Sequence, residues 1–582
     1  MADLKNILTH FLLAGTILGV KPLGNGLIND TYKVETEGET TPDYVLQRIN
    51  HNVFKDIKTL QDNIEIVTQH LRNKLDESDK NDIDRRVLHF MPTMEGQTYW
   101  YDGNDFWRVS VFIPNAKTYE TVTPEHAYDA GKAFGQFQAD LADLPDQLGE
   151  TIPKFHNMEF RLQQLHEAVA KDLVGRVSEV TELLEELESR AEYMCQAERL
   201  YREGKLPKRV CHCDTKVNNM LFDEDGSVLC VIDLDTVMPS FVFSDYGDFL
   251  RSAANTGNED DKDLNNVSFN MDIFRPFTKG YLESAQSFLT PIEIELLPYA
   301  VALFPYMQTV RFLTDYINGD TYYKIQYPEH NLIRSNAQFK LLCSVEEKTP
   351  EMKAYIDACL SSKKELTVKH IQLPDISLEN IPSYLDSLGI EYTNINIANW
   401  KQFPYKPEAR FRMVTTRKGI LLHYHVTENT VAAIADIDNG NVWEDSCVEF
   451  FSVPANDGIY YNMECNCAGT LLVGAGKNRT GRLRAPLDVL EKVERWSSLG
   501  RKSFKEKNGP VTWDLVLSIP YSTYFLHDIK TLEGQTIRAN FYKCGDKLQS
   551  PHYLSWNAIS LPKPNFHCPD FFGILHFEKE EE

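Results

Sequence analysis

A short polar loop between two apolar runs carries residue types that could do chemistry. Residues 212–219 have the form His-x-Asp-x-x-x-x-Asn, and the next apolar run ends at Asp233. Phosphoryl transfer from ATP requires one carboxylate that accepts the proton of the substrate hydroxyl, and an amide and a second carboxylate that hold Mg²⁺ against the phosphates. We therefore predict Asp214 as the base and Asn219 and Asp233 as ligands of Mg²⁺. Lys216 could stabilise the charge that develops during transfer.

The alternative interpretation of this stretch is a pair of surface turns, in which Asp and Asn are common. A His-x-Asp motif alone would favour that interpretation. The combination of histidine, aspartate, lysine and asparagine with a carboxylate at the end of the following strand favours the chemical one.

The loop and the strand after it resemble the aminoglycoside phosphotransferase and choline kinase superfamily of small-molecule kinases. The resemblance covers about residues 1 to 350, and segments 212–219 and 232–239 are most similar to those of N-acetylhexosamine 1-kinases. It implies an α+β, protein-kinase-like bilobal domain. It also implies ATP-dependent phosphorylation of the anomeric hydroxyl of N-acetylglucosamine or N-acetylgalactosamine, with Mg²⁺ as the metal.

Length and composition restrict the class of protein. A chain of 582 residues is too long for one core and predicts two to four domains, and a content of 42% hydrophobic and 25% charged residues is typical of globular proteins. The net charge of −25 argues against nucleic acid or an anionic membrane as a partner. The apolar residues 11–20 are too few to span a bilayer and lack a signal-peptide cleavage pattern.

The cysteine content indicates a reducing compartment. Eleven cysteines, an odd number spread over a long chain, fit free thiols better than a disulfide framework. The pairs Cys211/Cys213 and Cys465/Cys467 lack the two-residue gap and the remote partner pair of zinc sites, so we expect these thiols to pack inward. We expect a cytoplasmic protein, and its oligomeric state stays open.

A glycine-containing turn near the start of the chain precedes an alternating strand. Gly24, Asn25 and Gly26 could let backbone amides close on a phosphate, and Asn29 or Thr31 could add hydrogen bonds. Alone, such a turn indicates no more than a hairpin. At the start of a kinase-like chain, we predict that it covers ATP.

The strand at residues 44–49 should carry the basic residue that contacts the α- and β-phosphates in a kinase. Gln47 stands where the superfamily has Lys or Arg, and Arg48 follows it. Strand alternation points these two side chains to opposite faces, so either one could meet the nucleotide. Glu65, in the helical stretch that follows, is the candidate partner of that position.

The resemblance places a hinge at Pro114 and the acceptor site on a later helix. It implies that adenine lies against Phe112 and Ile113, and that residues 1–113 and 114–360 form the nucleotide-binding and helical lobes. A sugar needs hydrogen-bonding groups for its hydroxyls and flat rings for its C–H face.

Further roles in the helical lobe follow from the same resemblance. Tyr306 and Arg311 are the predicted sugar contacts, with a structural role as the alternative for Arg311. Three further residues are expected to support the catalytic loop: His212, Asp235 and Asp248. Asp245 is the alternative to Asp248 in this role.

From residue 371 on, helical periodicity gives way to short alternating runs and turns, which predict an all-β sandwich over 371–582. Residues 375–578 resemble the family 9-like carbohydrate-binding modules, and related modules can carry structural Ca²⁺. Trp443 and Trp556 are candidate sugar platforms, although a tryptophan in a sandwich usually belongs to the core.

Two alternative functions remain open at this stage. The kinase could act on another small alcohol, such as an aminoglycoside or an amino alcohol. The chain could also be a catalytically silent sugar-binding protein, which Gln47 favours and the intact set of Asp214, Asn219 and Asp233 opposes.

Overall fold

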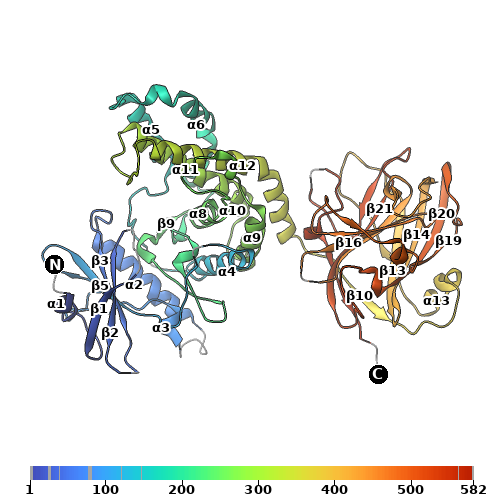
Figure 1. The fold of residues 1–582 in the computed structure, drawn as a ribbon, viewed down its shortest axis with the longest axis horizontal. Coiled ribbons are helices and arrows are strands. Elements are labelled where there is room, and N and C mark those ends of the chain that lie inside the picture. Colours follow the sequence, from blue (N-terminus) through green and yellow to red (C-terminus); the bar gives the residue numbers. More distant parts are fainter. Residues whose placement is uncertain are drawn as a thin grey trace. The chain divides into compact units, whose positions relative to one another are not determined.

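The computed structural model describes residues 4–23, 28–38, 40–75, 82–119, 121–145, 147–455, 457–561 and 563–579. The chain divides into two compact units, Met1–Ile356 and Asp357–Glu582 (Figure 1). The first is a kinase-like α+β domain and the second is a curled β-sheet domain, which confirms the predicted fold class. In the described part of the chain, no helix combines the length and the apolar character needed to cross a bilayer.

The N-terminal lobe is an antiparallel five-stranded sheet with the order β1-β2-β3-β5-β4. Alternate residues of its strands, among them Val34, Leu46 and Val109, are buried in one apolar cluster with Ile7 and Leu8 of the first helix. The strands and helices of this lobe are β1 (Ile17–Pro22), β2 (Asp30–Thr36), β3 (Tyr44–Ile49), β4 (Trp100–Tyr101), β5 (Phe106–Val111), α1 (Leu4–Leu8), α2 (Ile57–Lys74) and α3 (Ile83–Arg86).

Helix α2 connects the sheet to the helical lobe. Asp56 caps its N-terminus by accepting a hydrogen bond from the Thr59 backbone N–H. Leu60, Ile64 and Val67 follow at three- and four-residue steps and are buried with apolar residues of β3, of α4 and of the segment after β8. Figure 1 shows α2 beside the sheet.

The helical lobe packs around close glycine contacts. A Cβ atom on Gly131 would lie 2.0 Å from the Phe277 carbonyl oxygen, and one on Gly280 would lie 2.2 Å from that of Tyr128. Only glycine lets these two helices, α4 and α9, approach so closely. The helices of the lobe are α4 (Pro124–Asp140), α5 (Met158–Lys171), α6 (Thr181–Met194), α7 (Gln196–Arg202), α8 (Phe243–Ala253), α9 (Met271–Ala285), α10 (Pro291–Glu295), α11 (Leu297–Ile317) and α12 (His330–Leu360).

Two small hairpins carry the predicted catalytic residues. β6 pairs with β9, and β7 pairs with β8, both antiparallel. The polar loop lies between β6 and β7, and Asp233 lies between β8 and β9. The strands are β6 (Arg209–Cys211), β7 (Met220–Phe222), β8 (Val228–Val231) and β9 (Met238–Ser240).

In the second unit, a single hydrogen-bonded path runs through the strands in the order β18-β17-β16-β15-β21-β23-β10-β13-β14-β20-β19. β10 joins its two halves, because residues 365–368 pair with β23 and residues 369–370 pair with β13. The ring of Phe411 on β13 stacks on that of Phe541 on β21, with centroids 3.6 Å apart. The two halves therefore face each other across one apolar core.

The first strand of this unit, β10, begins before residue 371, where the sequence predicted the start of the β domain. It was not predicted because its two apolar side chains are too few to stand out from the charged residues around them. The elements of this unit are β10 (Glu365–His370), α13 (Ile381–Ser387), β11 (Thr393–Asn394), β12 (Ile397–Ala398), β13 (Glu408–Thr416), β14 (Gly419–Ala433), β15 (Cys447–Val453), β16 (Tyr460–Asn466), β17 (Leu471–Gly476), β18 (Leu483–Arg484), α14 (Leu487–Leu490), β19 (Glu494–Ser497), β20 (Phe504–Pro520), β21 (Thr536–Cys544), β22 (Tyr553–Ser555) and β23 (Gly573–Phe577).

Candidate active site and sugar pocket

The polar loop after β6 brings an acid, an amide and a cation together. The Lys216 Nζ lies 2.6 Å from the Asp214 Oδ1. The Asn219 side-chain amide donates a 2.7 Å hydrogen bond to the Asp214 carbonyl oxygen and lies 3.4 Å from its Oδ2. Burial lowers the pKa of the Lys216 ammonium, but Asp214 and Asp248 outweigh burial and raise that pKa above its usual value. The amide nitrogen of Asn219 is thus engaged, and its oxygen is the atom available to a cation.

Asp233 joins this group through the pairing of β7 with β8. The Ile232 backbone N–H donates a 2.9 Å hydrogen bond to the Asn219 carbonyl oxygen, and Asp233 follows in the left-handed region with φ 60°. Burial, followed by repulsion from Asp235 and Asp214, raises the pKa of Asp233 to about 6. Carboxylate and amide oxygens are the ligands that Mg²⁺ prefers, so this donor set fits that metal and would relieve the repulsion.

Asp245, at the start of α8, braces the catalytic loop. Its carboxylate accepts hydrogen bonds from the backbone N–H groups of His212 (3.0 Å) and Cys213 (2.8 Å), and from the Gln138 side chain (2.7 Å). These bonds hold Cys213 at φ 63°, a conformation that is rare for residues other than glycine. His212 is fully buried and its Nε2 lies 2.8 Å from the Ile232 carbonyl oxygen, so its ring links the loop to β8.

The prediction that Asp248 braces the loop is wrong. Asp248 lies one turn further along α8, and its Oδ1 accepts a 3.1 Å hydrogen bond from the Arg251 Nε. Asp245, the alternative predicted for this role, lies three residues earlier, at the start of α8 and next to the loop that follows β6. Sequence alone could not choose between two aspartates that differ by one helical turn.

A buried arginine that was not predicted from the sequence lies next to the segment that follows β8. Arg108 is on β5, and its guanidinium forms an ion pair with Asp235 at 2.5 Å. It also donates hydrogen bonds to the side-chain oxygens of Gln47 (2.9 Å) and Gln61 (3.2 Å). Both partners of the ion pair are buried. An arginine inside an otherwise apolar strand was the signal that could have identified it.

Gln47 and Arg48, the two polar residues of β3 that could meet a nucleotide, point to opposite faces of the sheet. Gln47 lies on the face of Arg108 and donates a 3.2 Å hydrogen bond to the Thr31 hydroxyl. Arg48 lies on the other face, where it pairs with Asp30 and Asp105. Arg48 therefore does not face the group that contains Asp235, because alternate residues of a strand point to opposite sides.

Other predicted contacts of this lobe are already engaged. Asn29 donates a 2.7 Å hydrogen bond to Asp235, and its Oδ1 accepts one from the Asn50 N–H, so it bridges β2 to the segment after β8. Glu65 is exposed, and Gln61 is the residue of α2 that meets the strand. The predicted phosphate-contacting residues 24–26 lie outside the described residues.

The two predicted adenine contacts point to different sides of the hinge. Ile113 is buried in a small cluster with Leu229 and Cys230 of β8, and Ile232 packs against this cluster. Phe112 is half-buried and lies under the Lys33 ammonium, 4.4 Å from its ring centroid. Of the two, Ile113 is the one on the side of the catalytic hairpin.

A cavity of about 320 Å³ in the helical lobe is lined by Arg311 of α11. Arg161, Tyr322 and Tyr323 also line it, and the carboxylate of Asp315 accepts the backbone N–H groups of both tyrosines at 2.8 and 2.9 Å. The cavity thus combines guanidinium donors with aromatic rings.

Two arginines that line this cavity act electrostatically on a histidine that contacts α8. His156 is half-buried, and its Nδ1 lies 3.0 Å from the Ser244 hydroxyl of α8. Burial, followed by the charges of Arg311, Arg161 and Arg251, lowers the pKa of His156 well below its usual value. The charges of these three arginines therefore all act on one imidazole. Arg251 also forms an ion pair with Asp248, whose charge helps to raise the pKa of Lys216.

The prediction that Tyr306 contacts the acceptor is wrong. Its side chain is fully buried, and its hydroxyl donates a 2.8 Å hydrogen bond to the Leu187 carbonyl oxygen of α6. Tyr306 lies five residues before Arg311, which on a helix places the two side chains on different faces. This hydrogen bond satisfies the buried Tyr306 hydroxyl where α11 packs against α6.

These two residues give a prediction about acceptor binding. Arg311→Gln is expected to raise the acceptor KM by about tenfold to a hundredfold, because a hydrogen bond from a charged donor contributes about 1.5–3 kcal/mol. Tyr306→Phe should leave that KM unchanged and lower the free energy of unfolding by about 1 kcal/mol. Steady-state kinetics and urea unfolding of both variants check this, and equal effects on KM would contradict the assignment.

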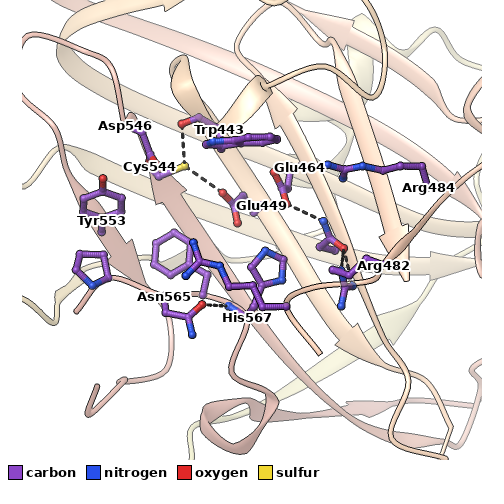
Figure 2. A pocket seen from close by; sticks show the side chains of 14 residues that line it. Trp443, Glu449, Glu464, Arg482, Arg484, Cys544, Asp546, Tyr553, Asn565 and His567 are labelled. Carbon is purple, nitrogen blue, oxygen red and sulfur yellow. Dashed lines mark hydrogen bonds between the residues drawn. The ribbon is translucent and has the colours of Figure 1, made fainter. Parts of the chain in front are cut away.

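The second unit contains a polar cavity of about 430 Å³ on the face of β15, β16 and β21 that points away from the core. Figure 2 shows the indole of Trp443 beside this cavity, with Glu449 and Glu464 at its base. The Arg482 guanidinium donates to the Asn462 Oδ1 at 2.6 and 3.0 Å. A flat ring beside hydrogen-bonding groups is an arrangement that can hold a sugar.

The prediction that Trp556 is a sugar platform is wrong. Its side chain is 2% exposed and packs edge-on against Phe411 and Phe541 in the core. Gly573 of the neighbouring strand β23 leaves room for this ring, because a Cβ atom on it would lie 2.6 Å from the Trp556 ring. The Ca²⁺ implied by the resemblance stays a prediction.

Comparison with known proteins assigns both units. Residues 19–277 match the phosphotransferase enzyme family, and residues 379–577 match carbohydrate-binding family 9. A carbohydrate-binding protein from Bacteroides uniformis, so described from its crystal structure, is 51% identical, and the match covers 37% of this chain and 100% of that one, with a TM-score of 0.37.

Two further solved structures are more distant. An aminoglycoside phosphotransferase from Alicyclobacillus acidocaldarius is 15% identical over 60% of this chain and 98% of its own, with a TM-score of 0.41. A family 9 module from Caldicellulosiruptor kristjanssonii, in complex with glucose, is 12% identical over 38% of this chain and 98% of its own, with a TM-score of 0.25.

The first unit therefore contains a domain that matches the phosphotransferase enzyme family. The chain joins this domain of the phosphotransferase enzyme family to a C-terminal domain of carbohydrate-binding family 9.

Proposed function

We propose that the N-terminal domain transfers the γ-phosphoryl group of ATP to the anomeric hydroxyl of an N-acetylhexosamine, and that the product is the sugar 1-phosphate. The observation that carries this proposal is the meeting of Asp214, Asn219 and Asp233 beside Lys216 in a phosphotransferase domain. The choice of N-acetylglucosamine or N-acetylgalactosamine as the acceptor is supported by the likeness of segments 212–219 and 232–239 to N-acetylhexosamine 1-kinases.

In this proposal, Asp214 orients the anomeric hydroxyl and accepts its proton as the hydroxyl oxygen attacks the γ-phosphorus and ADP leaves. The anomeric hydroxyl is the most acidic hydroxyl of a sugar, which suits a carboxylate base. Lys216 stabilises negative charge on the transferring group. Asn219 and Asp233 would hold Mg²⁺, which when bound offsets the charge of the phosphates.

The cavity lined by Arg311, Arg161 and Tyr323 is the proposed acceptor site. Guanidinium groups can donate to sugar hydroxyls and to the acetamido carbonyl oxygen, and tyrosine rings can cover a C–H face. Its volume of about 320 Å³ is in the range of sites for small molecules.

An acceptor panel tests the proposed function against its within-class rival. Purified protein with MgATP is offered N-acetylglucosamine, N-acetylgalactosamine, an aminoglycoside and an amino alcohol, and ADP release is measured for each. Turnover with the hexosamines at a kcat/KM at least a hundredfold above the others is expected. Phosphorylation of the amino alcohol or the aminoglycoside with none of either hexosamine would reject the assignment of substrate.

We further propose that the cavity beside Trp443 binds a sugar, which the family 9 match and the half-buried indole at the cavity support. Trp443→Ala is expected to weaken binding about tenfold or more, because an aromatic contact contributes about 0.5–1.5 kcal/mol beyond its buried area. Trp556→Phe should lower Tm and leave the affinity unchanged. Calorimetric titration with mono- and disaccharides measures both, and equal loss of affinity would contradict the placement of the site.

A further inference from the structure

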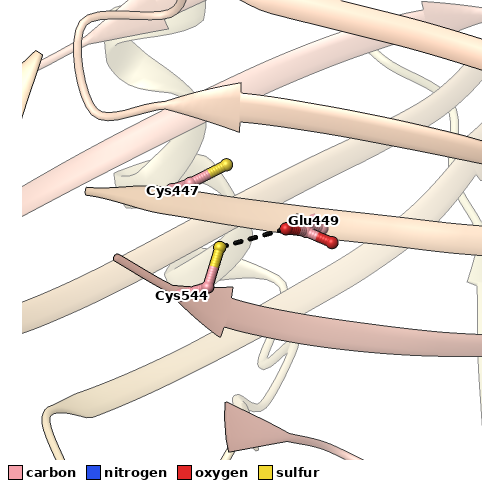
Figure 3. A group of neighbouring side chains, drawn as sticks. All are labelled: Cys447, Glu449 and Cys544. Atoms are coloured by element: carbon pink, nitrogen blue, oxygen red, sulfur yellow. Dashed lines mark hydrogen bonds between the residues drawn. The ribbon is translucent and has the colours of Figure 1, made fainter. Parts of the chain in front are cut away.

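Three potential metal ligands lie on one face of two neighbouring strands in the C-terminal domain. Cys447 of β15 pairs directly with Cys544 of β21, and Glu449 follows Cys447 by two residues, so the three side chains point the same way. Their ligand atoms all lie within 4.8 Å of one another. The Cys544 thiol donates a 3.0 Å hydrogen bond to the Glu449 Oε1 (Figure 3). Phe450, between the two ligands of β15, points to the core instead.

The cluster is buried. Cys447, Glu449 and Cys544 are 0%, 3% and 1% exposed, and in the described part of the chain no lysine or arginine forms an ion pair with Glu449. A second buried carboxylate of this domain, Glu428 of β14, does have a cationic partner: it lies 2.9 Å from the Lys543 Nζ. A buried carboxylate without such a partner is costly unless it is protonated or bound to a cation.

Neighbouring acids add to the negative character of this place. These neighbouring acids are Asp546 and Glu464. Both of these carboxylates line the same cavity as Glu449 and Cys544 (Figure 2).

We propose that Cys447, Glu449 and Cys544 bind one divalent cation of the zinc class. Two thiolates and one carboxylate are a donor set that Zn²⁺ accepts, whereas Mg²⁺ and Ca²⁺ prefer oxygen ligands only. Because Glu449 and Cys544 also line the cavity of about 430 Å³, a cation can enter from there. Three protein ligands would leave a fourth coordination position, which water or a ligand hydroxyl from the cavity could occupy.

This site differs from the cysteine pairs considered from the sequence. Cys465 and Cys467 are neighbours on β16 and its following turn, and both pack in the apolar core. The proposed ligands come instead from strands that are far apart in the sequence and adjacent in the sheet. The inference is independent of the proposed kinase reaction, which uses oxygen ligands in the other domain.

The test uses the full-length chain, which is stripped with a chelator and titrated with Co²⁺ and then with Zn²⁺. Wild type is expected to show a thiolate-to-cobalt charge-transfer band that saturates at one equivalent and disappears when Zn²⁺ replaces Co²⁺. The oxygen ligands of the kinase domain cannot give this band. Elemental analysis after dialysis against Zn²⁺ should likewise find one equivalent per chain.

Cys447→Ala and Cys544→Ala are expected to abolish the band and to weaken Zn²⁺ binding by more than the roughly 10- to 100-fold that loss of an outer-shell partner costs. Cys465→Ala removes a buried thiol outside the cluster and should bind as wild type. Circular dichroism confirms that each variant is folded. The proposal is overturned if folded wild type gives no thiolate band, or if the cluster variants and Cys465→Ala bind the metal equally well.

Discussion

Asp214→Asn is expected to lower kcat by about 10²- to 10⁴-fold, the usual contribution of a general base, while the affinity for ATP is retained. Asparagine has nearly the same shape as aspartate and keeps the backbone carbonyl oxygen that accepts the Asn219 amide. It cannot accept the proton of the anomeric hydroxyl. Rapid-quench measurement of sugar phosphate, together with calorimetric titration of nucleotide, separates the chemical step from binding.

The matched control for this variant is Asp225→Asn. Asp225 lies in the exposed turn between β7 and β8, where its Oδ1 accepts a 2.9 Å hydrogen bond from the Ser227 N–H. The same change of charge at that position should leave kcat within about twofold of wild type, since surface substitutions have small effects. An Asp214→Asn enzyme that keeps wild-type turnover would remove Asp214 from the role of base.

Arg108→Met is expected to lower the free energy of unfolding of the N-terminal domain by about 3–5 kcal/mol, the usual cost of removing one partner of a buried ion pair. The loss leaves the Asp235 carboxylate buried without its cation, and Asn29 alone then donates to it. Because Asp235 is two residues from Asp233, the change should also weaken nucleotide binding. Urea unfolding monitored by tryptophan fluorescence measures the first effect.

Arg48→Met is the control for this prediction. Arg48 lies on β3 with a side chain that is 41% exposed, and its ion pair with Asp30 should contribute only about 0–1 kcal/mol. The double variant Arg108→Met/Asp235→Asn should recover part of the lost stability, because it removes the unpaired charge. Equal destabilisation by Arg108→Met and Arg48→Met would show that the buried pair is not what holds the lobes at this point.

The geometry of the catalytic loop was accessible from the sequence because its parts are local. Asp214, Lys216 and Asn219 lie within one loop, and Asp233 is brought to them by a hairpin of two short strands. Fixed spacing along the chain therefore fixes proximity in space. The class of the domain and the curled β fold of the second unit could be predicted for the same reason, since each depends on periodicity and on short motifs.

The parts that could not be predicted depend on contacts between distant segments. Arg108 meets Asp235 only because β5 lies beside the segment after β8, and nothing in the spacing of the two residues indicates it. The roles of Asp245 and Tyr306 depend on which face of a helix meets a neighbour. A helix position can be read from the sequence, but the identity of the neighbour cannot.

The same limit applies to the C-terminal domain. Both Trp443 and Trp556 were candidate sugar platforms from the sequence, yet one borders a cavity and the other fills the core. The pair of Cys447 and Cys544 depends on the antiparallel pairing of β15 with β21. Spacing rules for cysteines along the chain do not detect a pair that forms across two strands.

The most direct test of the account is the identity of the oxygen that receives phosphate. N-Acetylglucosamine labelled with ¹³C at C1 is incubated with MgATP and enzyme, and ¹³C and ³¹P magnetic resonance spectra are recorded. The account predicts phosphorus coupling at C1 and the signal of a sugar 1-phosphate, absent with Asp214→Asn. Phosphate on any other oxygen of the sugar, or no sugar phosphate while an amino alcohol is phosphorylated, would contradict it.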